Sequence, residues 1–215
     1  MKLKKIFLIL IIIFCLSGCV NLNSLNYDTI VNTLSHSPKP ANTFKNGHQF
    51  YVPKGLQVSD SGTNYAILSS SDVFYYLYID LVSYNVKKNF NYETNDEAIY
   101  STKINYNGKR GYVEIKLWEN NQYLIEIMYN YAKIEVMVDE SLIKKALINS
   151  IVILNSIKYN DTIIDNLLND DNLTYTEEIF DMFEEVEENS SNLDFEVNDA
   201  EEEEQVEIKD TDFLN

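Results

Sequence analysis

Residues 100–118 have the sequence YSTKINYNGKRGYVEIKLW, which contains the clearest local structural signal in the chain. Two runs rich in branched and aromatic side chains, Tyr100–Tyr106 and Gly111–Trp118, flank the pair Asn107-Gly108. Asparagine and glycine accept the positive φ angles that a tight type I′ turn needs. The stretch therefore predicts a β-hairpin.

Further strands are expected on both sides of this hairpin. A turn at Glu119–Asn121 leads into Tyr123–Tyr131, and Lys133–Val138 continues the pattern. The alternation changes phase near Ala132, which indicates a turn or a bulge there. Upstream, β-rich runs bounded by turn residues predict three more strands. These are Gln49–Val52, Tyr65–Leu68 and Val73–Tyr84.

The alternation of side chains assigns one face of this antiparallel meander to the core, because successive residues of a strand point to opposite faces. On each strand the more apolar set should point inward. The residues expected in the core are Tyr75, Leu77, Ile79, Leu81, Val113, Ile115, Leu117, Ile125, Ile127 and Tyr129.

Helices are expected at both ends of the meander. Asn26–His36 predicts a short helix, capped by Asn26 or Asp28. A longer helix should follow Asp139, a good N-cap residue, since apolar residues recur at helical spacing from Ile143 to Leu154. Residues 155–160 should end it, and Asp161–Leu168 predicts a second short helix. The fold class is therefore α+β, an antiparallel meander packed against a long C-terminal helix and a short N-terminal helix.

This order of elements is similar to that of the PsbP-like sandwich domains found in several bacterial lipoproteins. The matching points are Phe50-Tyr51-Val52-Pro53-Lys54-Gly55 near the start and Leu154-Asn155-Ser156-Ile157-Lys158 near the end. Because one fold hosts many functions, this resemblance implies an architecture and no catalytic residues.

The N-terminus has the order of an export signal. Three lysines in the first five residues precede the apolar run Ile6–Phe14, which is followed by Leu16-Ser17-Gly18-Cys19. The run is too short to span a bilayer comfortably, which takes about 20 residues. The final four residues resemble the lipobox of bacterial lipoproteins. That resemblance implies cleavage between Gly18 and Cys19 and a diacylglyceryl group on Cys19. The alternatives are an ordinary secretory signal with a chance cysteine, or an uncleaved anchor.

Composition agrees with this interpretation. The two cysteines are Cys15, within the signal, and Cys19, so the mature domain must be stable without a disulfide. The chain has 26 asparagines, 23 isoleucines and six glycines, a bias typical of AT-rich genomes. It therefore resembles lipoproteins of low-GC Gram-positive bacteria, attached by lipid to the extracytoplasmic face of the cell membrane.

Charge separates a tail from the domain. We expect a signal peptide at 1–18, a linker at 19–25, one domain at 26–171 and an acidic tail at 172–215. From Thr176 onward there are 17 acidic residues and one lysine, so the tail should be mostly disordered. A short helix at Glu178–Val186 is an alternative for part of it. The tail is either a solvated, repulsive segment or an arm that binds cations or a basic partner.

Sequence motifs of catalysis and metal binding are absent. The chain has no Gly-x-Ser-x-Gly elbow, no phosphate-binding glycine loop and no His-Glu-x-x-His pattern. Its histidines, His36 and His48, have no ligand spacing, and His48 is expected at the surface. The acidic stretch 169–172 lacks the spacing of an EF-hand loop. We therefore expect no cofactor, no metal and no catalytic residue, with one alternative: hydrolysis by the strand carboxylates Asp80, Glu114 and Glu126.

The face opposite the core is the candidate binding surface. It is expected to carry aromatic rings among charges, an arrangement suited to binding a protein, a peptide or a glycan of the envelope. Alternatively, the helix at 26–36 covers these rings. Nucleic acid is an unsuitable partner, because the domain is acidic and faces out of the cell. The function expected is a non-catalytic binding or accessory protein, with a hydrolase or a passive structural lipoprotein as alternatives. The residues of this face are Phe74, Tyr76, Tyr78, Tyr112 and Trp118.

Overall fold

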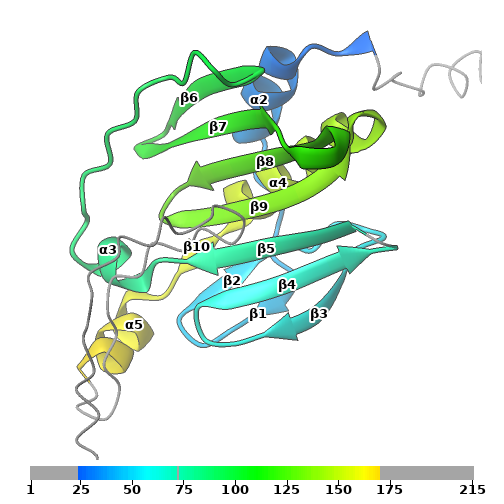
Figure 1. Cartoon of the computed structure of the whole chain (residues 1–215). Helices are drawn as coiled ribbons and strands as arrows, with labels where there is room; N and C mark the ends of the chain where they lie inside the picture. The colour runs from blue at the N-terminus through cyan, green and yellow to red at the C-terminus, as the bar shows by residue number, and fades with distance from the viewer. Residues whose placement is uncertain (1–23, 72, 170–215) are drawn as a thin grey trace, which may run out of the picture. The chain divides into compact units, whose positions relative to one another are not determined.

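Seven antiparallel strands form one sheet in the computed structural model, which describes residues 24–71 and 73–169 (Figure 1). Their spatial order is β3-β4-β5-β9-β8-β7-β6. The mixed α+β class with antiparallel sheets is therefore confirmed. The strands are β3 (Gln57–Ser61), β4 (Tyr65–Ser70), β5 (Val73–Ile79), β6 (Tyr100–Tyr106), β7 (Lys109–Leu117), β8 (Gln122–Tyr129) and β9 (Ala132–Asp139).

Asparagine-led turns connect the last four of these strands. In each turn two consecutive residues have positive φ, namely Asn107–Gly108, Asn120–Asn121 and Asn130–Tyr131. At Asn107–Gly108 and Asn130–Tyr131, the two-residue turns, positive φ at both central residues gives the type I′ geometry, whose twist matches that of the flanking strands. The predicted hairpin and the predicted turns near 120 and 132 are confirmed, and the second turn includes the 3-10 helix η2 (Glu119–Asn121).

The strand predicted at Val73–Tyr84 is too long. β5 ends at Ile79, and a short helix, α3, occupies Leu81–Asn85. The Asp80 carboxylate accepts a hydrogen bond from the Ser83 backbone N–H at 2.8 Å and so caps this helix. Because β-branched and aromatic residues continue past Ile79, the composition of the run concealed this change.

Two helices cover one face of the seven-stranded sheet, which we call the inner face. Helix α2 (Tyr27–Ser35) is capped by Asn26, whose side chain accepts from Thr29 N, as predicted. It packs on β6 and on helix α4 (Ile143–Ser156), which itself packs on β8 and β9. In Figure 1 both helices lie behind the sheet, and the opposite, outer face is turned to the viewer.

The predicted role of Asp139 as the helix cap is wrong. A 3-10 turn, η3 (Glu140–Leu142), follows Asp139, and α4 begins only at Ile143. The Asp139 side chain makes no capping hydrogen bond to η3.

Nine of the ten residues predicted for the core are buried, and Leu117 is not. Ile115 is fully buried, whereas 58% of Leu117 is exposed. Leu117 pairs with Tyr123 at the last position of β7, beside the turn. Alternation predicts the correct face for Leu117. However, Leu117 is the last residue of β7, and most of its side chain is left uncovered.

A second, three-stranded sheet has the order β1-β2-β10. It joins segments far apart in sequence, because β10 pairs with β2. The sequence predicted only that residues 155–160 end the helix before them, and gave no sign of this strand. His48 on β2 is buried, with 4% of its surface exposed, so its expected surface position is wrong. Helix α5 (Asp161–Leu168) follows β10, as predicted for that stretch, and packs on α3. The strands are β1 (Thr43–Phe44), β2 (His48–Phe50) and β10 (Lys158–Tyr159).

Some predictions concern residues outside the described ranges. They are the signal peptide, Cys19, most of the 169–172 stretch and the acidic tail at 172–215. Within residues 24–71 and 73–169, none of the helices combines the length and the apolar character needed to cross a bilayer.

Candidate functional site

Three glutamates form a row across the outer face of the sheet. Glu114 on β7 pairs with Glu126 on β8, which pairs with Glu135 on β9. Their exposed fractions are only 6%, 6% and 3%. Asp80, the third carboxylate considered for hydrolysis, is not part of this row, because it caps α3.

Glu114 is surrounded by hydrogen-bond donors. It accepts from the Tyr92 hydroxyl, from Asn95 Nδ2 at 3.3 Å and from Lys116 Nζ at 3.0 Å. Burial raises the pKa of Glu114, but these donors outweigh burial and bring the pKa below its ordinary value. Glu114 is therefore held as a carboxylate.

Glu126 is in a poorer environment for a negative charge. It accepts from the Tyr112 hydroxyl, and Glu135 lies on the neighbouring strand. Burial raises the pKa of Glu126, with a smaller rise from the charge of Glu135, and together these exceed the lowering by Tyr112 and nearby lysines. Glu135 forms an ion pair with Lys133 at 2.7 Å.

The segment between α3 and β6, residues 86–99, covers part of this face. The rings of Phe90 and Tyr92 stack on Tyr112 with centroid distances of 5.5 and 4.1 Å. Tyr92 also hydrogen-bonds Ser101 on β6 at 2.7 Å. Helix α2, which the sequence offered as a cover, lies instead on the inner side against α4 and β6. Tyr112 is therefore partly covered by a loop.

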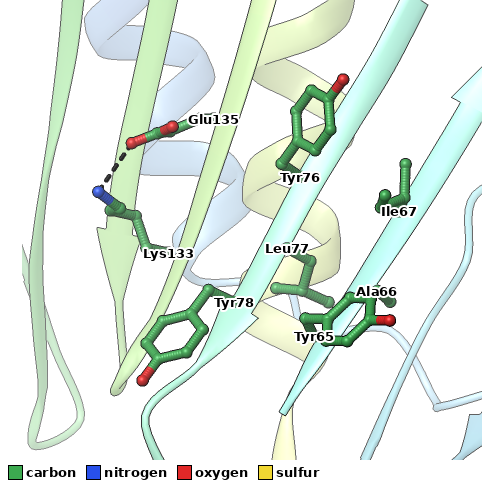
Figure 2. A pocket seen from close by; sticks show the side chains of 8 residues that line it. All are labelled: Tyr65, Ala66, Ile67, Tyr76, Leu77, Tyr78, Lys133 and Glu135. Carbon is green, nitrogen blue, oxygen red and sulfur yellow. Dashed lines mark ion pairs between the residues drawn. The ribbon is translucent and has the colours of Figure 1, made fainter. Parts of the chain in front are cut away.

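A second part of the outer face is hollowed between β4, β5 and β9, and we call this hollow the aromatic pocket. Its volume is about 200 Å³. Tyr65 and Tyr78 lie at one end of it, Tyr76 and Ile67 at the other, and the Lys133–Glu135 ion pair lies at its β9 side (Figure 2). The pocket thus combines ring faces with one charged pair.

The structure divides the predicted aromatic set. Phe74, Tyr76 and Tyr78 share β5, where Phe74 is 45% exposed and the other two line the aromatic pocket. Tyr112 lies on β7, separated from β5 by β8 and β9. Trp118 directly follows the last residue of β7 and is half-buried.

The sequence analysis missed residues of the glutamate row and of the aromatic pocket, although the pattern of the strands contained signals for them. Tyr65 and Ile67 alternate with the buried Ala66 and Leu68, which places them on the outer face. Their register partners are Tyr78 and Tyr76. The turn at Asn130–Tyr131 likewise sets Glu135 opposite Glu126. Counting outward from each turn would have given both sites.

Comparison with known proteins adds no relative: no family model and no curated protein matches the chain. In the described part of the chain, groups of three or more histidines, cysteines or acids placed to hold a metal ion are absent.

Proposed function

We propose that this chain is a lipid-anchored, non-catalytic binding module of the cell envelope. Cys19 carries the lipid, and the aromatic pocket on the outer face binds the partner. The order of charges, apolar residues and Leu16-Ser17-Gly18-Cys19 supports the anchor. The observation that carries the binding role is the aromatic pocket, which opens on the sheet face away from α2 and α4.

The size and lining of the pocket favour one kind of ligand. Its volume of about 200 Å³ is below the roughly 300–1,000 Å³ of pockets for whole cofactors or drug-sized molecules. Tyrosine rings supply contact area at low entropic cost and a hydroxyl that hydrogen-bonds. We therefore propose that the pocket takes a single apolar side chain of a peptide or one sugar ring. The Lys133–Glu135 pair would bind polar groups at the edge of that ligand.

The glutamate row supplies the main argument for the alternative, an envelope hydrolase. Glu114 and Glu126 face each other, and their pKa values move apart, a pattern common to acid and base pairs in enzymes. However, donors from within the chain already engage both carboxylates. Tyr92, Asn95 and Lys116 donate to Glu114, and Tyr112 donates to Glu126. This favours a role in holding the 86–99 segment on the sheet.

The length of the linker supports a partner close to the membrane. Seven residues lie between Cys19 and the helix cap Asn26, counting the cap. A fully extended chain of that length spans at most about 25 Å. The start of α2 would then lie within that distance of the lipid, which favours ligands near the membrane.

Site-specific photo-crosslinking in living cells tests the binding role. A photoreactive phenylalanine at Tyr76 lies in the aromatic pocket, and the same group at Phe44 on β1, which is 71% exposed, is the matched control. The proposal predicts a discrete adduct at position 76 that is absent at position 44. A second substitution, Tyr78→Ala, should remove this adduct. Identical adducts at both positions, or none at 76, would contradict a binding role for this pocket.

A further inference from the structure

A separate pocket lies at the end of the sheet where two of the asparagine-led turns meet, and we call it the basic pocket. Its volume is about 180 Å³. Three of the residues that line it, Lys88, Lys109 and Arg110, are basic, and none is acidic. It shares no residue with the aromatic pocket. A concave site with this charge bias is suited to an anion.

Three segments distant in sequence build the basic pocket. Lys88 and Asn89 belong to the segment that follows α3, Arg110 lies at the start of β7, and Asn130 is in the β8–β9 turn. The turn is held to the β7 strand because Asn130 N donates to the Arg110 carbonyl at 3.0 Å. Two of the three segments, the turn and the start of β7, are therefore held together at the site.

Arg110 is the residue best placed to bind a ligand. Its register partner is Asn105 on the edge strand β6, and its side chain is exposed. Within the ranges that the structure describes, its guanidinium makes no ion pair. A guanidinium presents a fork of donors that matches phosphate and carboxylate oxygens.

Among the residues that the structure describes, Lys109 has no partner in an ion pair. Lys109 Nζ lies 3.4 Å from the Asn155 carbonyl at the end of α4 and 5.9 Å from the centroid of the Tyr129 ring. Burial lowers the pKa of Lys109, and the charge of Lys158 lowers it further. Lys109 therefore adds a positive charge to the lining of the pocket.

We propose that the basic pocket binds a phosphate group, with Arg110 and Lys88 as its charged contacts. The lining residues that carry donor groups come from three segments: Lys88 with Asn89, Arg110, and Asn130. A phosphate offers more oxygens to donors from three segments than a carboxylate, which has two oxygens in one plane. The phosphate belongs either to a phospholipid headgroup or to a free phosphate ester. The site is independent of the proposed role of the aromatic pocket.

Calorimetric titration of the full chain in a neutral detergent tests this proposal. Three ligands distinguish the sources: inorganic phosphate, glycerol phosphate and a soluble short-chain phosphatidylglycerol. The variants are Arg110→Gln and Lys88→Gln, and Lys54→Gln is the control, because Lys54 is an exposed lysine in another turn. Arg110→Lys keeps the positive charge and removes only the planar fork of guanidinium donors.

The proposal predicts that at least one of these ligands binds and that Arg110→Gln and Lys88→Gln each weaken it by about tenfold or more. Lys54→Gln should change the affinity by less than about twofold. The loss of affinity in Arg110→Lys should lie between those in Lys54→Gln and Arg110→Gln. Binding of the lipid alone identifies a headgroup, and binding of glycerol phosphate with equal affinity identifies a free ester. No binding of any ligand, or equal losses in Lys54→Gln and Arg110→Gln, would overturn the proposal. An unchanged melting temperature shows that each variant is folded.

Discussion

Glu114 and Glu126 face each other across β7 and β8, yet their pKa values move in opposite directions from the same ordinary value of 4.5. Burial raises both pKa values, more strongly at the more deeply placed Glu126, and the two residues also differ in the number of donors. Tyr92, Asn95 and Lys116 donate to Glu114, whereas Glu126 has the Tyr112 hydroxyl and a neighbouring carboxylate, Glu135. The same residue type, with 6% of its surface exposed at both positions, thus favours ionisation at one and disfavours it at the other.

We therefore expect the two glutamine variants to differ in stability. Near neutral pH, Glu114→Gln should lower the free energy of unfolding by about 1.5–3 kcal/mol, because charged hydrogen bonds are lost. Glu126→Gln should change it by less than about 1 kcal/mol or raise it, since it removes a poorly solvated charge. Urea denaturation of both variants measures these changes.

The pH dependence gives the sign of each effect. The pKa of Glu126 is raised on folding. Its contribution to the free energy of unfolding is therefore complete below pH 4.5 and is lost as the pH rises through the folded pKa. The pKa of Glu114 is lowered on folding. Its contribution to the free energy of unfolding is therefore present above pH 4.5 and is lost as the pH falls through the folded pKa. The account is wrong here if Glu126→Gln proves the more damaging variant near neutral pH.

His48 should make the domain sensitive to mild acid. Burial lowers its pKa from 6.5 to about 4, and the nearby charge of Lys45 adds to this. Its contribution to stability is therefore present above pH 6.5 and is lost as the pH falls toward 4, by on the order of 3 kcal/mol. His48→Gln should remove this part of the pH dependence, and His36→Gln, at an exposed site, should not. Equal slopes for wild type and His48→Gln in denaturation between these pH values would exclude this role.

Two apolar residues of β7 that share one face should respond differently to truncation. Ile115→Ala should cost about 2–5 kcal/mol, because Ile115 is fully buried. Leu117→Ala should cost less than about 1 kcal/mol, since Leu117 is largely exposed. Thermal or chemical denaturation of both variants measures the contrast, and similar losses would mean that α4 or another segment covers Leu117 in solution.

Gly111 should tolerate no side chain. A Cβ at this position would lie 1.9 Å from the Met128 carbonyl oxygen and 2.7 Å from Tyr129 Cα, both backbone atoms of β8. Gly111→Ala should therefore separate β7 from β8 and cost about 3 kcal/mol or more. Gly62→Ala is the control, because its new Cβ would meet only the partly exposed ring of Tyr65, which can move. A stable Gly111→Ala protein would indicate that this part of the sheet can be rearranged.

Local signals were sufficient for much of the sheet. Asn107-Gly108 predicted its turn because few other pairs accept two positive φ angles, and alternation assigned the core residues around Ile115 and Ile127. Asn26, one of the two candidate caps, caps its helix. These features depend on residues that are close in sequence.

Features that depend on tertiary contacts were not predicted. The 86–99 segment lies on the sheet through contacts such as that of Tyr92 with Glu114, 22 residues apart in sequence. The partners of β2 and the burial of His48 likewise depend on β10, more than 100 residues away. Within the candidate site, alternation found Tyr76 and Tyr78. It could not show that β9 and β8 separate them from Tyr112.

The proposed attachment of this module to a membrane depends on one modified residue, Cys19. Intact-mass spectrometry of the protein extracted from the membranes of its producing cells tests this most directly. The account predicts a chain that begins at Cys19 and carries the added mass of a diacylglyceryl group, and a Cys19→Ala variant without that mass. A chain that begins at Met1, or one cut elsewhere and free of acyl groups, would contradict it.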